Sequence, residues 1–217
     1  MLMMASSLSA GTYSGGDGSE SNPYQIATTD DLIELSNTSG DWDKYFIQTA
    51  DITFNADETQ VDWDGDGTLE HGDYDDDFFG FSPIGNYSNK NFTGSYDGDG
   101  YTISNLYINR SVGSNLNIGL FGYADGCSIM NIGVKNVDVS GYYYVGGLVG
   151  WLNTNSTISS CFSSGIVSGN TYVGGLLGVC GSSISSSYSA CTVSCNSGTA
   201  GGLIGEIFDE PTISNCY

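Results

Sequence analysis

The sequence predicts an all-β protein folded as a right-handed parallel β-helix. Two short phrases repeat along it in phase. In the first, an isoleucine follows Thr or Ser at positions 103, 129, 158, 184 and 213, which gives steps of 26, 29, 26 and 29 residues. The second phrase is Gly-Leu-apolar-Gly, at 119–122, 147–150, 175–178 and 202–205. A fixed period of this size is typical of a solenoid, in which each coil covers its neighbours.

The composition of the repeats favours strands over helices. They are rich in Ile, Val and Tyr and are separated by Gly, Ser and Asn, which is typical of short strands joined by turns. Between residues 102 and 217 no stretch has apolar residues at helical spacing over two turns. A repeat of about 27 residues fits one coil of a β-helix, with coils roughly 4.8 Å apart. The right hand follows from the general rule for parallel crossovers.

A corner is predicted within the first phrase. Ile103 and Leu106 are both apolar but three positions apart, so a straight strand would place them on opposite faces. A bend at Asn105 resolves this conflict, because Asn tolerates the left-handed backbone conformation of a sharp corner. Asn131 and Asn215 occupy the same place in later copies, and a structural ladder of Asn is favoured over a catalytic use.

The repeats resemble the GLUG motif. The fullest copy spans residues 145–169, with Val-Gly-Gly-Leu-Val-Gly, then Ile-Ser-Ser-Cys-Phe from 158 to 162, then Val-Ser-Gly from 167 to 169. The resemblance covers roughly residues 22–217. It implies a secreted or surface-anchored microbial protein, often adhesin-like, and sometimes a surface peptidase in which the repeats are accessory. The motif is structural and brings no catalytic residues.

Four regions are predicted in chain order. Residues 1–10 resemble the end of a signal peptide. Residues 11–44 form a linker and an N-terminal cap, with a short helix over 29–35 that Thr29 caps and that covers the open end of the β-helix. Residues 45–101 form the first irregular coils, interrupted by an acidic insertion at 55–80. Residues 102–217 form the repeats, which we expect to continue into the remainder of a larger surface protein.

The acidic insertion predicts a structural calcium site. Its pattern Asp-x-Asp-x-Asp-Gly resembles a calcium loop whose twelfth place holds Asp instead of Glu. Alternating acids converge on one point, and Ca²⁺ takes six to eight oxygen ligands. The expected ligands are Asp62, Asp64, Asp66, the backbone carbonyl of Thr68, and Asp73. The alternative is a solvated acidic insertion that binds no ion.

Net charge limits the classes of binding partner, and the cysteine count bears on disulfides. The net charge is −21, with only four cationic side chains, so nucleic acid and anionic lipid are excluded as partners. No stretch is suited to membrane insertion. Six cysteines permit disulfides in a secreted chain, and Cys191 and Cys195 could meet across a turn, although this pair is not favoured. Cys161 and Cys216 fit small buried apolar positions.

Aromatic residues are the candidate ligand contacts. If the apolar residue after each corner points inward, the residue that follows it points outward. These outward residues would stack from coil to coil, except at Gly133, which has no side chain. They are Tyr107, Phe162, Tyr188 and Tyr217. Trp151 and residues 142–144 lie at expected turns and are similar candidates. Such rings bind sugars or proteins, but they also stabilise neighbouring strands, and this structural interpretation is favoured.

The sequence therefore favours a non-enzymatic extracellular module for adhesion or surface display. A rigid rod would contact a glycan, or a protein of a host or neighbouring cell, along its side. One alternative is a polysaccharide lyase or hydrolase on the same fold, which needs clustered acids or an acid group with a basic residue. Another is a structural spacer without a ligand.

Overall fold

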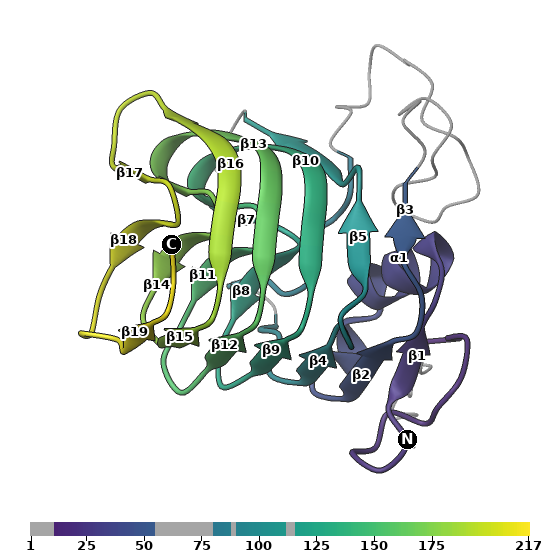
Figure 1. Cartoon of the computed structure of the whole chain (residues 1–217). Helices are drawn as coiled ribbons and strands as arrows, with labels where there is room; N and C mark the ends of the chain where they lie inside the picture. Colours follow the sequence, from purple (N-terminus) through teal and green to yellow (C-terminus); the bar gives the residue numbers. More distant parts are fainter. Residues whose placement is uncertain (1–10, 55–79, 88–89, 112–115) are drawn as a thin grey trace, which may run out of the picture.

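The structure is a computed structural model that describes residues 11–54, 80–87, 90–111 and 116–217 (Figure 1). Both the segment compared with a signal peptide and the predicted calcium ligands, Asp62 to Asp73, lie outside the described residues. Within the described residues, no helix is both long enough and apolar enough to cross a membrane.

The chain is a parallel β-helix, as the sequence predicts. Three sheets wind around one core, and every pairing between named strands is parallel. The first sheet contains, in spatial order, β1 (Tyr24–Ile26), β2 (Tyr45–Gln48), β4 (Ser95–Asp97), β9 (Ser128–Met130), β12 (Thr157–Ser159), β15 (Ser183–Ser185) and β19 (Ile213–Ser214).

The other two sheets complete each coil. The second contains β16 (Tyr188–Cys195), β13 (Phe162–Gly174), β10 (Gly133–Gly146), β5 (Thr102–Ser104) and β3 (Ile52–Thr53), with β17 (Ala200–Gly201) beside β13, and β6 (Tyr107–Arg110) and β7 (Leu116–Ile118) beside β10. The third contains β18 (Ile204–Ile207), β14 (Leu177–Cys180), β11 (Val149–Leu152) and β8 (Phe121–Ala124). Figure 1 shows the coils stacked side by side from the N-terminal to the C-terminal end.

Four isoleucines of the repeated phrase form one column on the first sheet. Ile129 pairs with Ile158, Ile158 with Ile184, and Ile184 with Ile213. The first three are almost fully buried. The residue two positions after each isoleucine turns the corner with φ between 49° and 55°; these residues are Asn131, Ser160, Ser186 and Asn215. The predicted left-handed corner is confirmed.

The first copy of the phrase belongs to a different column, which corrects the predicted register. Ile103 lies in the second sheet, where it pairs with Ile52 and Val134. Tyr96 takes the place beside Ile129 in the first sheet. The step from Tyr96 to Ile129 is thus 33 residues, longer than the steps of the later coils. Asn105 still turns a corner, with φ of 60°, because the local sequence specifies the bend and not the sheet that the bend joins.

The core changes from aromatic to aliphatic along the axis. In the early coils, ring centroids lie 4.8 Å apart for Phe92 and Phe121, 5.6 Å for Tyr96 and Phe121, and 6.3 Å for Phe46 and Phe92. The hydroxyl of buried Tyr96 donates to Oε1 of Gln48 at 3.2 Å, so its polar atom is satisfied. The buried residues of the later coils are mainly Val, Leu and Ile. Large rings therefore fill the core of the early coils, and smaller aliphatic side chains fill that of the later ones.

A short helix covers the N-terminal end of the stack, as predicted (Figure 1). This helix, α1 (Thr29–Asn37), buries Leu32 and Leu35 completely, and the indole N–H of Trp42 donates to the Leu35 carbonyl at 2.8 Å. A 3-10 turn, η1 (Ser39–Asp41), follows it. The N-cap is Thr28 and not Thr29: the amide of Asp31 donates to Oγ1 of Thr28, which is the first half of a capping box.

Asp31 ties this cap to the chain before it. Its Oδ2 accepts hydrogen bonds from the Ser14 hydroxyl at 2.7 Å, the Ala27 amide at 2.9 Å, and the Thr28 amide and hydroxyl at 3.0 and 2.9 Å. Burial alone would raise the pKa of Asp31, but these hydrogen bonds together lower it below its ordinary value of 3.8. The ionised carboxylate therefore stabilises the cap.

We expect Asp31→Asn to lower the free energy of unfolding by about 2 kcal/mol at neutral pH, since hydrogen bonds to a charged acceptor are replaced by weaker ones. The folded pKa is depressed, so the carboxylate's contribution is complete above the unfolded pKa and is lost as pH falls through the folded one. Urea unfolding of both proteins from pH 7 into strong acid should show the difference shrinking below about pH 4. A difference that stays constant over that range would contradict the role of the charge.

Candidate binding surface

The expected stack of aromatic residues is present in three coils. The rings of Phe162 and Tyr188 lie 5.1 Å apart and 5° from parallel, and those of Tyr188 and Tyr217 have the same geometry. We call these three rings the aromatic stack. At Gly133, a Cβ atom would lie 2.2 Å from the Phe162 ring, so that ring covers the glycine. Lys135 Nζ lies 5.9 Å from the Phe162 ring centroid.

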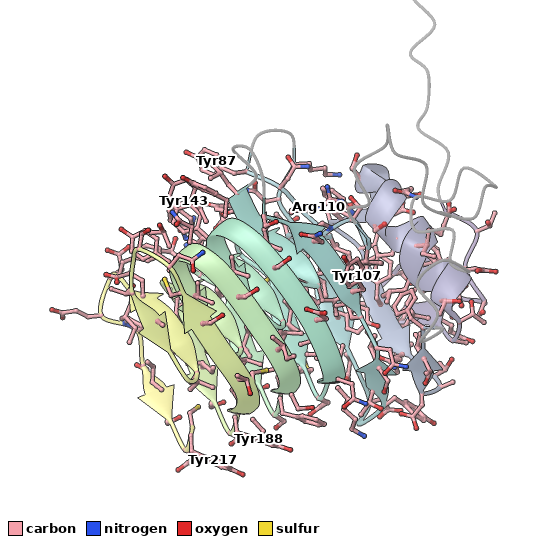
Figure 2. All side chains as sticks on the ribbon, turned by 90° about the horizontal axis from the view of Figure 1, so that it is seen from above. Tyr87, Tyr107, Arg110, Tyr143, Tyr188 and Tyr217 are labelled. Carbon is pink, nitrogen blue, oxygen red and sulfur yellow. The ribbon has the colours of Figure 1, made fainter. Side chains whose placement is uncertain are left out.

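Tyr107 is not part of the stack, which corrects the expected alignment. Phe162 is in register with Gly133, whose partner on the other side is Thr102. Tyr107 pairs with Asp138 instead, and Figure 2 places it well away from Tyr188 and Tyr217. The alignment failed because the first copy of the phrase, at Ile103, lies in the second sheet and not in the first. Whether Tyr107 contacts a ligand stays a prediction.

The geometry of the stack suits stabilisation of the coils. Parallel rings at this spacing cover each other's faces, so mainly the ring edges are accessible to solvent. A sugar ring packs on an aromatic face, and the stack leaves few faces open. The structural interpretation is therefore the better one for Phe162 and Tyr188.

A second and larger aromatic group lies on the other side of the molecule. Figure 2 shows Tyr87 and Tyr143 together there, opposite Tyr188 and Tyr217. Trp151 is at its centre, with ring centroids 4.6 Å from Tyr144, 5.7 Å from Phe208 and 5.8 Å from Tyr123. We call the whole group the aromatic ridge; its members are Tyr87, Tyr123, Tyr142, Tyr143, Tyr144, Trp151, Tyr172 and Phe208.

Most contacts in the ridge are tilted or edge-to-face. The interplanar angle is 72° for Tyr142 and Tyr143 and 73° for Tyr87 and Tyr123. Tyr87 is 66% exposed. Trp151 lies within β11 and residues 142–144 lie within β10, not at turns, contrary to the prediction. Sequence reasoning missed Tyr87, Tyr123, Tyr172 and Phe208; the 28-residue step from Tyr144 to Tyr172, whose rings stack at 5.5 Å, was the available signal.

The GLUG-like glycines let neighbouring coils approach closely beside Tyr144 and Tyr172 of the ridge. Where the second sheet turns toward the third, Asn117, Tyr144 and Tyr172 have φ of 64°, 51° and 57°. Their backbones lie against the last glycine of the phrase in the following coil: a Cβ would lie 2.5 Å from the Asn117 carbonyl carbon at Gly150 and 2.5 Å from that of Tyr144 at Gly178. Only glycine fits there, because a side chain would meet the backbone of the preceding coil.

A shallow open groove adjoins the ridge on the second sheet. It has a volume of about 150 Å³, and its lining is polar and uncharged: Ser111, Ser140, Gly141, Tyr142, Ser168, Gly169, Asn170, Ser194 and Asn196. Ser140, Ser168 and Ser194 are in register, so they form one column across three coils. We call this feature the serine groove.

The buried cysteines supply no reactive group. All six are free thiols. Burial raises the pKa of Cys161 to about 12 and that of Cys127 to about 11, so both are protonated at neutral pH. The thiols of Cys191 and Cys195 contact the carbonyls of Gly175 and Asn170, not each other. Cys161 is buried as predicted, whereas Cys216 is partly exposed.

No metal centre accompanies the groove in the described part of the chain, where no three His, Cys, Asp or Glu side chains gather closely enough to hold an ion.

Comparisons with known proteins agree with the repeat pattern and the fold. Residues 141–168 match the GLUG motif, which confirms the resemblance in that segment. Halomucin from Haloquadratum walsbyi is 36% identical over 153 residues, 69% of this chain. A candidate Gly-rich membrane protein from Evansella cellulosilytica is 30% identical over 132 residues, 60% of this chain. The chain spans only 2% and 12% of the lengths of these two relatives.

One solved structure shares the fold. It is that of a candidate immunoglobulin A1 protease from Bacteroides ovatus, with a TM-score of 0.68 and 21% identity, over 94% of this chain and 70% of that one. At this level of identity the likeness establishes the fold alone.

Proposed function

We propose that this chain is a non-enzymatic module of an extracellular or cell-surface protein, and that it binds a glycan or a protein along its side. The observation that carries the proposal is the aromatic ridge next to the serine groove. The groove serines are in register in three coils, and Tyr144 of the ridge recurs as Tyr172, whose ring stacks on it. A solenoid of this kind presents the same chemistry several times along one face.

The expected mechanism is many weak contacts, whose combined strength comes from avidity. The proposal is supported by the absence of charged side chains among the nine groove residues, since general acid–base catalysis needs titratable groups within reach of the substrate. A surface location is supported by the GLUG motif and by the relative named as a membrane protein. The calcium loop at 62–73 remains part of the proposal as a structural element.

A candidate immunoglobulin A1 protease shares this fold, so the experiment also tests whether the chain cleaves peptide bonds. The experiment uses the whole chain on neutral polysaccharides, acidic polysaccharides and immunoglobulin A1, with calcium or with a chelator. Retention and released fragments are followed together. We expect retention without fragments, and weaker retention after chelation if the acidic loop stiffens the chain.

Three outcomes distinguish the alternatives. Released sugars or peptides would overturn the proposal in favour of an enzyme. Neither retention nor products on any surface would favour a spacer. Retention that is the same in chelator and in calcium would leave the binding function in place and remove the calcium ion from it; Asp64→Asn should then have no effect on retention.

A further inference from the structure

The serine groove repeats at the spacing of the coils. Ser140, Ser168 and Ser194 each contribute one hydroxyl, and successive hydroxyls are one strand spacing, roughly 4.8 Å, apart. One pyranose unit in an extended polysaccharide advances by a similar length. A chain laid along the helix axis would therefore place about one sugar over each coil.

Two of the three hydroxyls are available for a ligand. The Ser140 hydroxyl donates to Oδ1 of Asn109 at 2.9 Å, as the Ser111 hydroxyl does at 3.0 Å. The hydroxyls of Ser168 and Ser194 make no hydrogen bond to any residue that the structure describes. A serine hydroxyl is one donor and accepts twice, so each of these matches a sugar hydroxyl in either role.

The floor and one wall of the groove follow from the strand pattern. Gly141 faces inward, where a Cβ would lie 2.7 Å from Ile118 and 2.8 Å from Val145; Gly169 faces inward in the same way. The strands thus lie close to the core at these positions, and the outer surface is hollow there. Tyr142 forms the wall, and its edge-to-face contact with Tyr143 at 4.6 Å joins the groove to the aromatic ridge.

Charge selects among glycans. None of the nine lining residues is charged, so no side chain in the groove would pair with a uronate or sulfate group. The net charge of −21 repels polyanions at long range. A neutral polysaccharide needs no counter-charge in the groove and is not repelled by the net charge of the protein. Its hydroxyl groups can still form hydrogen bonds with the serine hydroxyls and asparagine amides of the groove.

We propose that the serine groove binds a neutral polysaccharide along the helix axis, with sugar hydroxyls on Ser168 and Ser194 and a sugar face against Tyr142. The site rests on the proposed binding function and specifies its ligand class. Because three serines are in register, affinity should rise with chain length up to three or four sugar units and change little beyond that.

The test is calorimetric titration of the full chain with neutral oligosaccharides of two to six units, linked as in glucans, mannans and galactans, and with alginate oligosaccharides. Two substitutions of one serine form a matched pair. Ser168→Val removes the hydroxyl and should weaken binding about tenfold, whereas Ser168→Thr keeps it and should bind as the wild type does. Tyr142→Ala should also lose at least about tenfold. Tyr188→Ala, in the aromatic stack at the other end of strand β16 from Ser194, is the control that should bind normally.

Circular dichroism and melting curves establish that each variant is folded. If binding of neutral oligosaccharides depended on Tyr188 and not on Ser168 or Tyr142, the serine groove would not be the binding site, although the proposed binding function would stand. Tighter binding of alginate than of neutral chains would overturn the ligand class. No oligosaccharide binding, with retention on immunoglobulin A1 intact, would overturn this inference alone; no retention on any surface would overturn the proposed function as well.

Discussion

Gly150→Ala should destabilise the protein by about 3 kcal/mol or more, because the added methyl group has no space. A Cβ at this position would lie 2.5 Å from both the carbonyl carbon of Asn117 and the amide nitrogen of Ile118. Both are backbone atoms of the preceding coil, which cannot move aside as a flexible side chain would. The change would separate two coils and break the pairing of β11 with β8.

Urea unfolding followed by circular dichroism measures this loss. The matched control is Gly202→Ala, at the first glycine of the same phrase in a later coil, where nothing lies within 4 Å of the added Cβ. That variant should unfold close to the wild-type midpoint. Equal losses for the two substitutions would show that glycine is needed for chain flexibility and not for close coil packing.

Phe121→Ala should remove about 3–5 kcal/mol from the free energy of unfolding, the range found when a buried ring is deleted. Phe121 is fully buried and packs against Phe92 and Tyr96. The surrounding coils are held by their strand pairing, so they cannot collapse into the vacated space. The cavity would lie at the join between the aromatic and aliphatic parts of the core.

Two further variants calibrate that loss in the same unfolding assay. Phe121→Leu keeps part of the volume and should cost less than Phe121→Ala. Tyr87→Ala removes a ring that is 66% exposed and should cost little. A loss for Phe121→Ala as small as that for Tyr87→Ala would contradict the view that the aromatic core holds the early coils together.

The sequence was sufficient for the fold because its repeated phrases specify local geometry. The column from Ile129 to Ile213 and the left-handed corners follow directly from the spacing of isoleucine and the residue two places later. The same locality explains the error at Ile103. Its phrase forms the same bend, but the sheet to which a strand belongs depends on the strands beside it, and Ile103 pairs with Ile52 and Val134 in the second sheet.

The candidate site was predictable only in part. Trp151 and the tyrosines at 142–144 were candidates from the sequence. Tyr123 and Phe208 come from other coils and meet Trp151 only through the winding of the chain, and Tyr87 joins the group through Tyr123. The serine groove gives no composition signal, because Ser168 and Ser194 are two of many serines in the repeats. The groove can be recognised only once the register of the strands is known, because register aligns the outward-facing serines and places the inward-facing glycines next to them.

The parallel winding of the three sheets also determines how the chain responds to tension. Figure 1 places the two ends of the chain at opposite ends of the stack, so a pull between them runs along the axis, in the direction of the hydrogen bonds. Such a load opens the bonds in sequence instead of shearing a whole sheet at once. Each later coil of 26 or 29 residues would unroll to roughly 90–100 Å at about 3.5 Å per residue. Coils that yield one at a time would let the chain lengthen in steps under load, while the coils not yet opened keep their packing.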